Sequence, residues 1–290
     1  MNLSVILLLF VTLVWGTTFP LLKSASSSLS GIEISAARFL IASVCMLPFA
    51  IKAPARAWRD GAVLGALALT SYVAQAYGLE HISSNRSAFL TSLNVLMVPF
   101  LGLCFGGRLS WPVLLASTMA CVGIGLMSWE GGGNWQGDGA TLICALAYAL
   151  YTILLSQRSG RHEARHLAAT QIIFMAVFAS LWVGLTGINE PRFATLPSRL
   201  QEHAPNLIYL GLIATAGMLM LQAQAQRNVS ADKAAVIYAM EPVFAALFGW
   251  LLLSESLTVQ AGIGGGMVVV AVILSELKPA PKPGSSPKAA

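Results

Sequence analysis

The chain has 290 residues, of which 56% are hydrophobic and 10% are charged, with a mean hydropathy of +0.73 and a formal net charge of +5. Soluble domains carry about 25% charged residues, so this chain has too few charges to cover a water-exposed globule. The composition therefore excludes an ordinary soluble protein and predicts that the apolar side chains face lipid or pack between helices.

Ten apolar segments follow one another along the chain. Each is long enough to cross a bilayer as a helix, because about 20 residues span the hydrocarbon core. The segments are 4–23, 31–51, 61–79, 87–107, 109–129, 139–157, 167–189, 204–226, 234–254 and 256–275. We therefore expect an all-α membrane protein with ten transmembrane helices, followed by a disordered cytoplasmic tail, 278–290, that is rich in Pro, Lys and Ser.

Basic residues are distributed unevenly between the two sides that the ten segments define. With the N-terminus inside, twelve Lys and Arg residues fall on the inner side, four fall on the outer side, and Arg38 lies within a segment. Because cytoplasmic connections carry an excess of Lys and Arg, we expect both termini in the cytoplasm. This topology also explains the pI of about 9.2, so nucleic acid is not an expected partner.

The second half of the sequence repeats the first. At an offset of 133 or 147 the matched pairs include Trp15 with Tyr148, Arg38 with Gln171, Gln75 with Gln222, Arg86 with Lys233, and Asn94 with Glu241. Residues 1–129 and 138–277 then each hold five helices, and the loop at 188–203 supplies the extra length of the second half. Since five is odd, the repeats are inverted, an architecture of secondary transporters whose substrate site lies near the midplane.

Several of these residues resemble a known family. WGTTFP at 15–20, the basic Arg86 that opens the fourth helix, and MEPVFAALFGWLLLSESLT at 240–258 are similar to the drug/metabolite transporter superfamily, in its ten-helix EamA-type branch. The likeness covers roughly residues 4–276. The first repeat departs from the pattern, because Asn94-Val95 stands where the second repeat has Glu-Pro, and Gly107-Arg108 replaces the closing acid, Glu255.

The resemblance implies a basket in a bacterial inner membrane, with helices 1–4 and 6–9 around a central cavity and helices 5 and 10 outside. It also implies export of small metabolites by alternating access. The chain is similar to the bacterial exporters of aromatic amino acids within this branch, so amino acids, aromatic and other neutral ones, are the expected cargo. Proton-coupled export of drugs, organic cations or other metabolites is the alternative.

Polar and aromatic residues inside the predicted helices are the candidates for the cavity wall. Polar groups in lipid are expensive and tend to face a bundle interior or a water-filled cavity. Aromatic rings supply apolar area and a cation–π face, and amides and hydroxyls bind carboxylate or ammonium groups, which together favour a small zwitterion or an aromatic metabolite. The candidates are Trp15, Thr18, Arg38, Tyr72, Gln75, Asn94, Tyr148, Tyr151, Gln222, Tyr238 and Glu241.

Arg38 and Glu241 are the strongest candidates, because a charge near the bilayer centre costs at least ~2.5–3.5 kcal/mol. The two can pair as a brace, Arg38 can hold a substrate carboxylate, and Glu241 can exchange a proton. Glu241 can instead steady the helix where Pro242 interrupts its hydrogen bonds. Pro20 and Pro99 are expected to kink helices 1 and 4 and to act in gating.

Small residues on two helices suggest close packing. Gly262 and Gly266 form a GxxxG pattern in helix 10, and helix 5 carries Gly123 and Gly125. Such residues allow close helix approach, either within the chain or in a homodimer through helices 5 and 10.

No cofactor or metal is expected, since the sequence has no CxxC motif and no His-rich cluster. A membrane-embedded enzyme is the non-transport alternative. The spans hold no paired carboxylates and no Ser-His arrangement, so the chain is not expected to be an enzyme.

Overall fold

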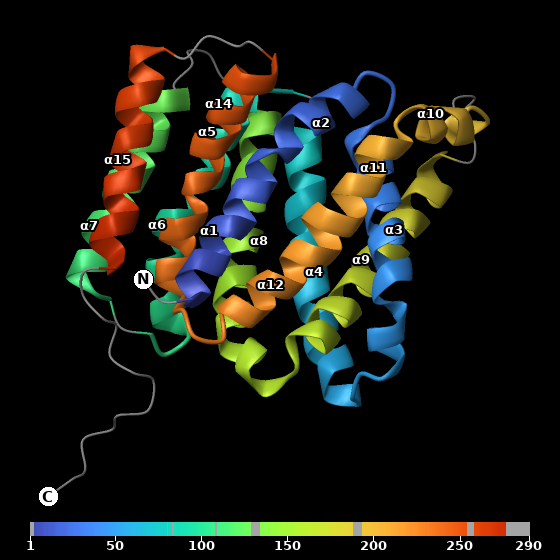
Figure 1. Cartoon of the computed structure of the whole chain (residues 1–290), viewed down its shortest axis with the longest axis horizontal. Helices are drawn as coiled ribbons and strands as arrows, with labels where there is room; N and C mark the ends of the chain where they lie inside the picture. The colour runs from blue at the N-terminus through green and yellow to red at the C-terminus, as the bar shows by residue number, and fades with distance from the viewer. Residues whose placement is uncertain are drawn as a thin grey trace, which may run out of the picture.

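The computed structural model describes residues 3–79, 81–82, 84–107, 109–128, 134–187, 193–253 and 258–276. Over these ranges every regular element is a helix and no strand is assigned, as the composition predicts. The helices run side by side in one bundle (Figure 1). The disordered tail predicted for 278–290 lies outside the described residues.

The helices fall into the ten predicted segments, several of which are built from two or three consecutive elements. In chain order they are α1 (Leu3–Gly16) with α2 (Thr18–Ala25); α3 (Gly31–Ile51); α4 (Ala55–Leu79); α5 (Ser84–Ser92) with α6 (Asn94–Cys104); α7 (Trp111–Ser128); α8 (Trp135–Arg158); α9 (Ala164–Gly187); α11 (Ala204–Gly211), η3 (Leu212–Gly217) and α12 (Met218–Ala225); α13 (Ala231–Tyr238) with α14 (Met240–Leu253); and α15 (Val259–Glu276). Two short elements lie between them, η1 (Ser159–Arg161) and α10 (Leu196–Glu202).

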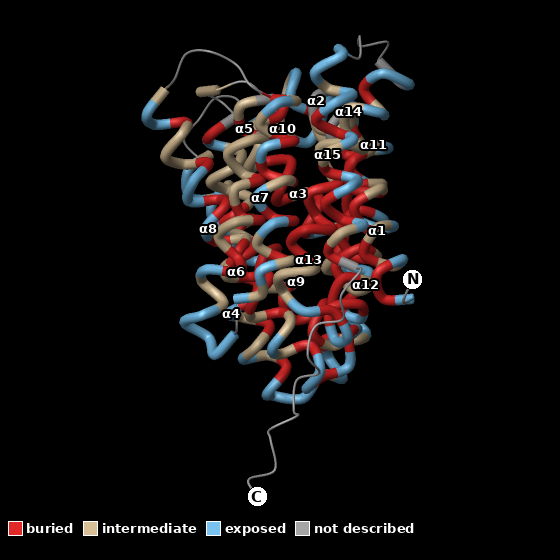
Figure 2. The backbone as a smooth tube through the Cα atoms, turned by 90° about the vertical axis from the view of Figure 1, so that its left-hand side faces the viewer, coloured by how far each residue is buried: buried red, intermediate tan, exposed pale blue. Residues whose placement is uncertain are grey.

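The segments have the length and apolar composition of membrane spans. Within the described residues, 6 helices are long and apolar enough to cross a membrane, and Leu3–Gly16, Phe89–Cys104 and Val259–Ser275 are shorter apolar helices. Large hydrophobic side chains such as Leu185, Ile51 and Val259 are exposed on the outer surface. Figure 2 shows buried residues concentrated inside the bundle, with exposed ones at its ends and on its outside. This pattern fits a bundle surrounded by lipid.

Two helices end four residues before a proline. α1 ends at Gly16 and α13 ends at Tyr238, which are the residues four before Pro20 and Pro242. Proline has no N–H to donate to that carbonyl, and in both cases the helix ends there and restarts after one residue. Pro99, by contrast, lies inside unbroken α6.

A third break, at Leu93, has a different cause. The side-chain Nδ2 of Asn94 donates to the carbonyl of Thr91 at 2.8 Å, where it competes with the backbone for that acceptor. At the repeat offset of 147, Leu93 falls on Met240, beside the break at Ala239.

The two halves of the chain pack against each other through α3, α4, α8 and α9, and α7 packs on α15 at one edge of the bundle (Figure 1). The fifth and tenth predicted helices, which are α7 and α15, thus lie together outside the central group, as the resemblance implies. Glycine allows this contact, because a Cβ at Gly264 would meet the backbone oxygen of Gly123 and the side chain of Met127. A Cβ at Gly262 or Gly266 would meet no heavy atom within 4 Å.

We expect Gly264→Val to destabilise the protein by ~1–3 kcal/mol, the usual cost of overpacking a close contact. Gly266→Val is the matched control, since its side chain would enter open space. Thermal unfolding of the purified variants in detergent measures both. Equal midpoints for the two variants would contradict the packing described between α7 and α15.

Candidate functional site

Arg38 lies in the middle of α3 and is 4% exposed. Its Nε donates to Oγ1 of Thr215 at 2.9 Å. Its guanidinium carbon lies 5.2 Å from the ring centre of Tyr72 and 5.8 Å from that of Phe39. No described residue accepts a hydrogen bond from its two terminal amino groups. The cation is thus held on one edge and over one face, and its other edge has no acceptor among the described residues.

Glu241 lies in the first turn of α14, directly after the break at Ala239. A carboxylate is favoured there, because the N-terminus of a helix carries a partial positive charge. Arg38 and Glu241 interact electrostatically but form no ion pair, and no described residue donates a hydrogen bond to the carboxylate. Neither an ion pair between Arg38 and Glu241 nor a hydrogen bond to the Glu241 carboxylate is therefore seen among the described residues.

Four aromatic rings from three segments lie next to these charges. Tyr148 stacks on Tyr151 with 5.9 Å between ring centres, and Tyr238 lies 6.0 Å from Tyr148 and 5.9 Å from Trp15. Trp15 is 6% exposed and its Nε1 donates to the carbonyl of Ala214 at 2.9 Å, so it faces the bundle interior. The hydroxyl oxygen of Tyr148 is buried without a hydrogen-bond partner. We call Trp15, Arg38, Tyr72, Tyr148, Tyr151, Tyr238 and Glu241 the central cluster.

A chain of buried hydrogen bonds runs from the central cluster along the second half. Tyr151 donates to Gln222 at 3.2 Å, the amide of Gln222 donates to the hydroxyl of Tyr238 at 2.9 Å, and that hydroxyl donates to Gln226 at 3.0 Å. The amide of Gln226 in turn donates to Ser156 at 2.9 Å. The amides of Gln222 and Gln226 are thereby satisfied, and α8, α12 and α13 are tied together.

The other predicted residues have more local roles in this structure. The hydroxyl of Thr18 donates to the carbonyl of Trp15 at 2.7 Å, within one turn. Asn94 is buried and bonds only to its own helix, at the break. Gln75 is half-buried, and no described residue forms a hydrogen bond with it. The structure therefore brings Gln222 into contact with the central cluster through two tyrosines, and it shows no such contact for Gln75.

Sequence reasoning missed Thr215 and Cys144. Thr215 lies in η3, the π-helical turn, and contacts Arg38, while Cys144 lies 3.2 Å from the hydroxyl of Ser71 in the interior. Apolar neighbours surround both positions in the sequence, so neither is distinguished by pattern. The only sequence signal for η3 is a pair of glycines, Gly211 just before it and Gly217 at its end. Groups of three or more His, Cys, Asp or Glu that could hold a metal are absent from the described part of the chain.

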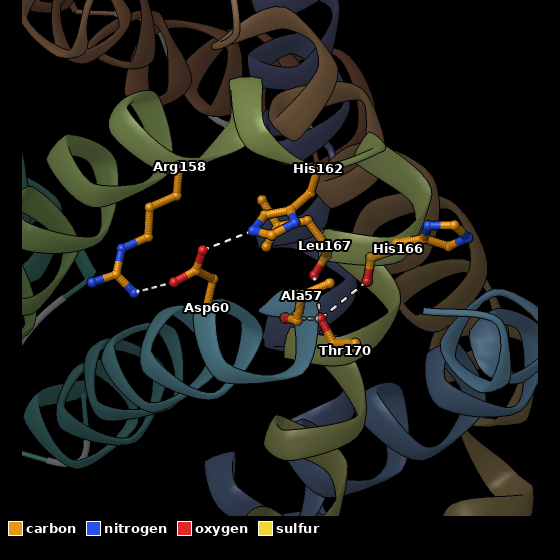
Figure 3. A network of polar contacts seen from close by, with 7 residues as sticks. All are labelled: Ala57, Asp60, Arg158, His162, His166, Leu167 and Thr170. Atoms are coloured by element: carbon orange, nitrogen blue, oxygen red, sulfur yellow. Dashed lines mark hydrogen bonds and ion pairs between the residues drawn. The ribbon is translucent and has the colours of Figure 1, made fainter. Parts of the chain in front are cut away.

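A second polar group lies away from the central cluster, at the end of the bundle where α8 meets α9 (Figure 3). Asp60 accepts from Nη1 of Arg158 at 3.0 Å, and its other carboxylate oxygen lies 2.7 Å from Nε2 of His162. Close by, Thr170 of α9 donates to the carbonyl of Ala57 of α4 at 3.0 Å. These contacts join the first half of the chain to the second.

We expect Asp60→Asn to lower the free energy of unfolding by ~1–3 kcal/mol, because it leaves partly buried Arg158 and His162 with a weaker acceptor. Glu163→Gln is the control, because Glu163 is exposed and pairs only with exposed Arg165, whose hydrogen bond lowers the pKa of that carboxyl. Thermal unfolding in detergent measures both variants. A midpoint for Asp60→Asn no lower than that of the control would contradict this assignment.

Ion pairs also join the halves at the opposite end of the bundle. Arg86 of α5 forms two hydrogen bonds with Asp138 of α8, at 2.6 and 2.8 Å. Arg199 of α10 binds both carboxylate oxygens of Glu33 in α3 at 3.1 Å. Charged contacts between the halves therefore lie at both ends of the central cluster.

Two surface grooves lie apart from the central cluster. One, of about 590 Å³, is lined by apolar residues of α3 and α9 such as Leu40, Ile173 and Leu181. The other, of about 140 Å³, lies by Glu33 and Phe193. Neither contains a residue of the central cluster, and the exposed apolar side chains of the first fit the lipid-facing surface.

An all-helical membrane bundle with charged and aromatic groups in its interior is typical of transporters. The model of the EamA-like transporter family matches residues 2–129 and 135–277, and the chain belongs to this family. An "uncharacterized transporter" of Archaeoglobus fulgidus is 30% identical over 93% of this chain and 85% of its own length. The "uncharacterized inner membrane transporter YedA" of Escherichia coli is 26% identical over 91% of this chain and 88% of its own.

A solved crystal structure has the same fold. It aligns with a TM-score of 0.78 at 15% identity and covers 95% of this chain and 98% of its own. The family and the relatives make this chain a membrane transporter.

Proposed function

We propose that the protein is a secondary transporter that exports small zwitterionic metabolites, with aromatic and other neutral amino acids as its cargo. The observation that carries this proposal is the pair of charges inside the bundle, of which Arg38 is buried and Glu241 half-buried. The free edge of Arg38 suits a carboxylate, and the unpartnered carboxylate of Glu241 suits an ammonium group. An amino acid carries both groups, and its binding would neutralise both charges in the interior.

The aromatic part of the central cluster favours a cargo with an apolar side chain. The rings of Trp15 and Tyr148 each lie about 6 Å from that of Tyr238 by their centres, so the three form one apolar surface on which a ring or an aliphatic chain could pack. The free hydroxyl of Tyr148 adds one hydrogen-bonding group. An inorganic ion would instead favour rings of charged side chains or ordered carbonyls.

Transport would proceed by alternating access between the two halves. The ion pairs at the two ends of the bundle, Asp60 with Arg158 and Arg86 with Asp138, each join one half to the other. Opening either end would separate one of them while the other persists. We place the protein in a bacterial inner membrane with both termini in the cytoplasm, in keeping with the excess of basic residues on that side.

Counterflow tests this function. Purified protein in liposomes would be loaded with unlabelled amino acids, and labelled phenylalanine, tryptophan or alanine would be offered outside without an imposed proton gradient. We expect internal amino acid to accelerate uptake, and we expect amino-acid amides, which lack the carboxylate, to compete poorly. No acceleration by any amino acid, with folded protein in the membrane, would exclude the proposal.

Proton-coupled export of organic cations is the second candidate. It is favoured by the lone carboxylate of Glu241 beside aromatic rings, because rings and a carboxylate together bind cations. An organic cation has no need of Arg38. Uptake of a labelled aromatic cation that is driven by a proton gradient and unaffected by Arg38→Gln would select this candidate over amino-acid export.

A homodimer through the fifth and tenth predicted helices, α7 and α15, is a further proposal. Gly264 is occupied by packing within the chain, whereas Gly262 and Gly266 have open space beside them on α15. Their free positions leave room for a second helix at this edge. Cross-linking in membranes of a single cysteine introduced at Gly262 tests the dimer.

A further inference from the structure

Thr215 lies at an irregular point of the helix formed by α11, η3 and α12, where the α-helix widens into the π-helical turn η3. Such turns are rare and mark positions where regular hydrogen bonding is given up for another arrangement. Here the hydroxyl of Thr215 donates to the carbonyl of Leu210, five residues earlier, at 2.7 Å. Thr215 is fully buried, so its hydroxyl has no water as an alternative partner.

This hydrogen bond determines whether the Thr215 hydroxyl donates or accepts toward Arg38. A hydroxyl has one proton, and that proton is committed to Leu210, so toward Arg38 the oxygen acts as an acceptor. It receives the Nε–H of Arg38 at 2.9 Å. With Nε occupied, a carboxylate can bind the guanidinium through two hydrogen bonds only at the edge formed by the two terminal amino groups. Tyr72 lies over the face of the same group.

The same turn is joined to the first half at two more points. The carbonyl of Ala214, next to Thr215, accepts the Nε1–H of Trp15 at 2.9 Å. Gly211, just before the turn, packs on α3, and a Cβ there would lie 2.7 Å from Cβ of Ile41 and 3.0 Å from the carbonyl oxygen of Arg38. Glycine therefore allows the turn to approach α3 at the residue that Thr215 binds.

We propose that Thr215 is a positioning residue, which orients the guanidinium of Arg38 so that its terminal amino groups bind the substrate carboxylate end-on. This inference rests on the proposed function, since it assumes a substrate with a carboxylate. It predicts that removing the hydroxyl weakens recognition of the carboxylate specifically. Recognition of the rest of the substrate is unaffected.

Thr215→Val tests this inference, because valine keeps the shape of threonine and lacks the hydroxyl. We expect the apparent KM for an amino acid in counterflow to rise about tenfold, the effect of losing one hydrogen bond to a charged group. The inhibition constant of the corresponding amide should not change. Thr215→Ser, which keeps the hydroxyl, should restore the wild-type ratio of the two constants.

Thr170→Val is the matched control, because Thr170 is also fully buried and its hydroxyl also bonds to backbone carbonyls, while no hydrogen bond joins it to Arg38. In Thr170→Val, the ratio of the apparent KM for the amino acid to the inhibition constant of its amide should equal that of the wild type. If Thr215→Val does not reconstitute, Thr215→Cys makes the same comparison, since a thiol is a weak acceptor.

The outcomes separate the two proposals. Wild-type protein that treats the amino acid and its amide alike would overturn both. A wild-type preference that Arg38→Gln abolishes and Thr215→Val leaves intact would overturn the positioning role alone.

Discussion

Replacing Arg38 by glutamine is expected to raise the apparent KM for amino-acid counterflow about 30-fold, equivalent to ~2 kcal/mol for a lost pair of charged hydrogen bonds. The reason is geometric, since the terminal amino groups of Arg38 have no acceptor among the described residues and only a ligand can provide one. Arg38→Lys should recover little of this loss. An ammonium group is a point charge and cannot present two parallel N–H groups to a carboxylate.

The control for this experiment is Arg165→Gln. Arg165 also lies over an aromatic ring, 5.9 Å from the centre of Phe49, but it is exposed at one end of the bundle. We expect wild-type kinetics from it. Counterflow into liposomes, with the amount of folded protein set by size-exclusion chromatography, measures all three variants. A wild-type KM in folded Arg38→Gln would remove Arg38 from the binding site.

Glu241→Gln is expected to raise the apparent KM for amino acids about tenfold while downhill exchange persists at saturating substrate. An unpartnered carboxylate near the substrate contributes roughly one charged hydrogen bond to an ammonium group, about 1.4 kcal/mol. Competition by an N-acetyl amino acid, which lacks the ammonium group, should be the same in wild type and variant. Glu202→Gln, at the exposed end of α10, is the control.

The same variant distinguishes facilitated diffusion from proton coupling. We expect an imposed proton gradient to leave the wild-type uptake rate unchanged, as for exchange down a concentration gradient. If the gradient drives accumulation in the wild type and this drive disappears in Glu241→Gln, Glu241 exchanges protons and the transporter is proton-coupled.

The sequence predicts the helices of this fold well, because about 20 apolar residues in water-free surroundings leave the backbone few alternatives to a helix. It also predicts two of the helix breaks, since Pro20 and Pro242 act on carbonyls at known positions. The break at Leu93 was not foreseen. It depends on a hydrogen bond from the side chain of Asn94 to the carbonyl of Thr91, and a pattern of polar and apolar residues does not predict that bond.

The sequence predicts which charged and aromatic residues belong to the candidate site, but it does not predict which side chains contact one another. Arg38, Glu241 and the tyrosines stand out because polar groups are rare in lipid. Thr215 does not, because a single hydroxyl in a membrane helix usually bonds to its own backbone, and its contact with Arg38 joins segments that are far apart in the chain. Asp60 and His162 are far apart in the chain, so their contact required the fold.

The positions of the two interior charges bear on how such a chain evolved. In the two-repeat architecture that we propose, Arg38 has Gln171 as its counterpart and Glu241 has Asn94, so each half contributes one charge. A dimer of first halves alone would bury two arginines, and a dimer of second halves two glutamates, in each case without an opposite charge. The ancestral gene duplication would thus have become irreversible once the copies diverged at these positions, because neither half can now be replaced by the other.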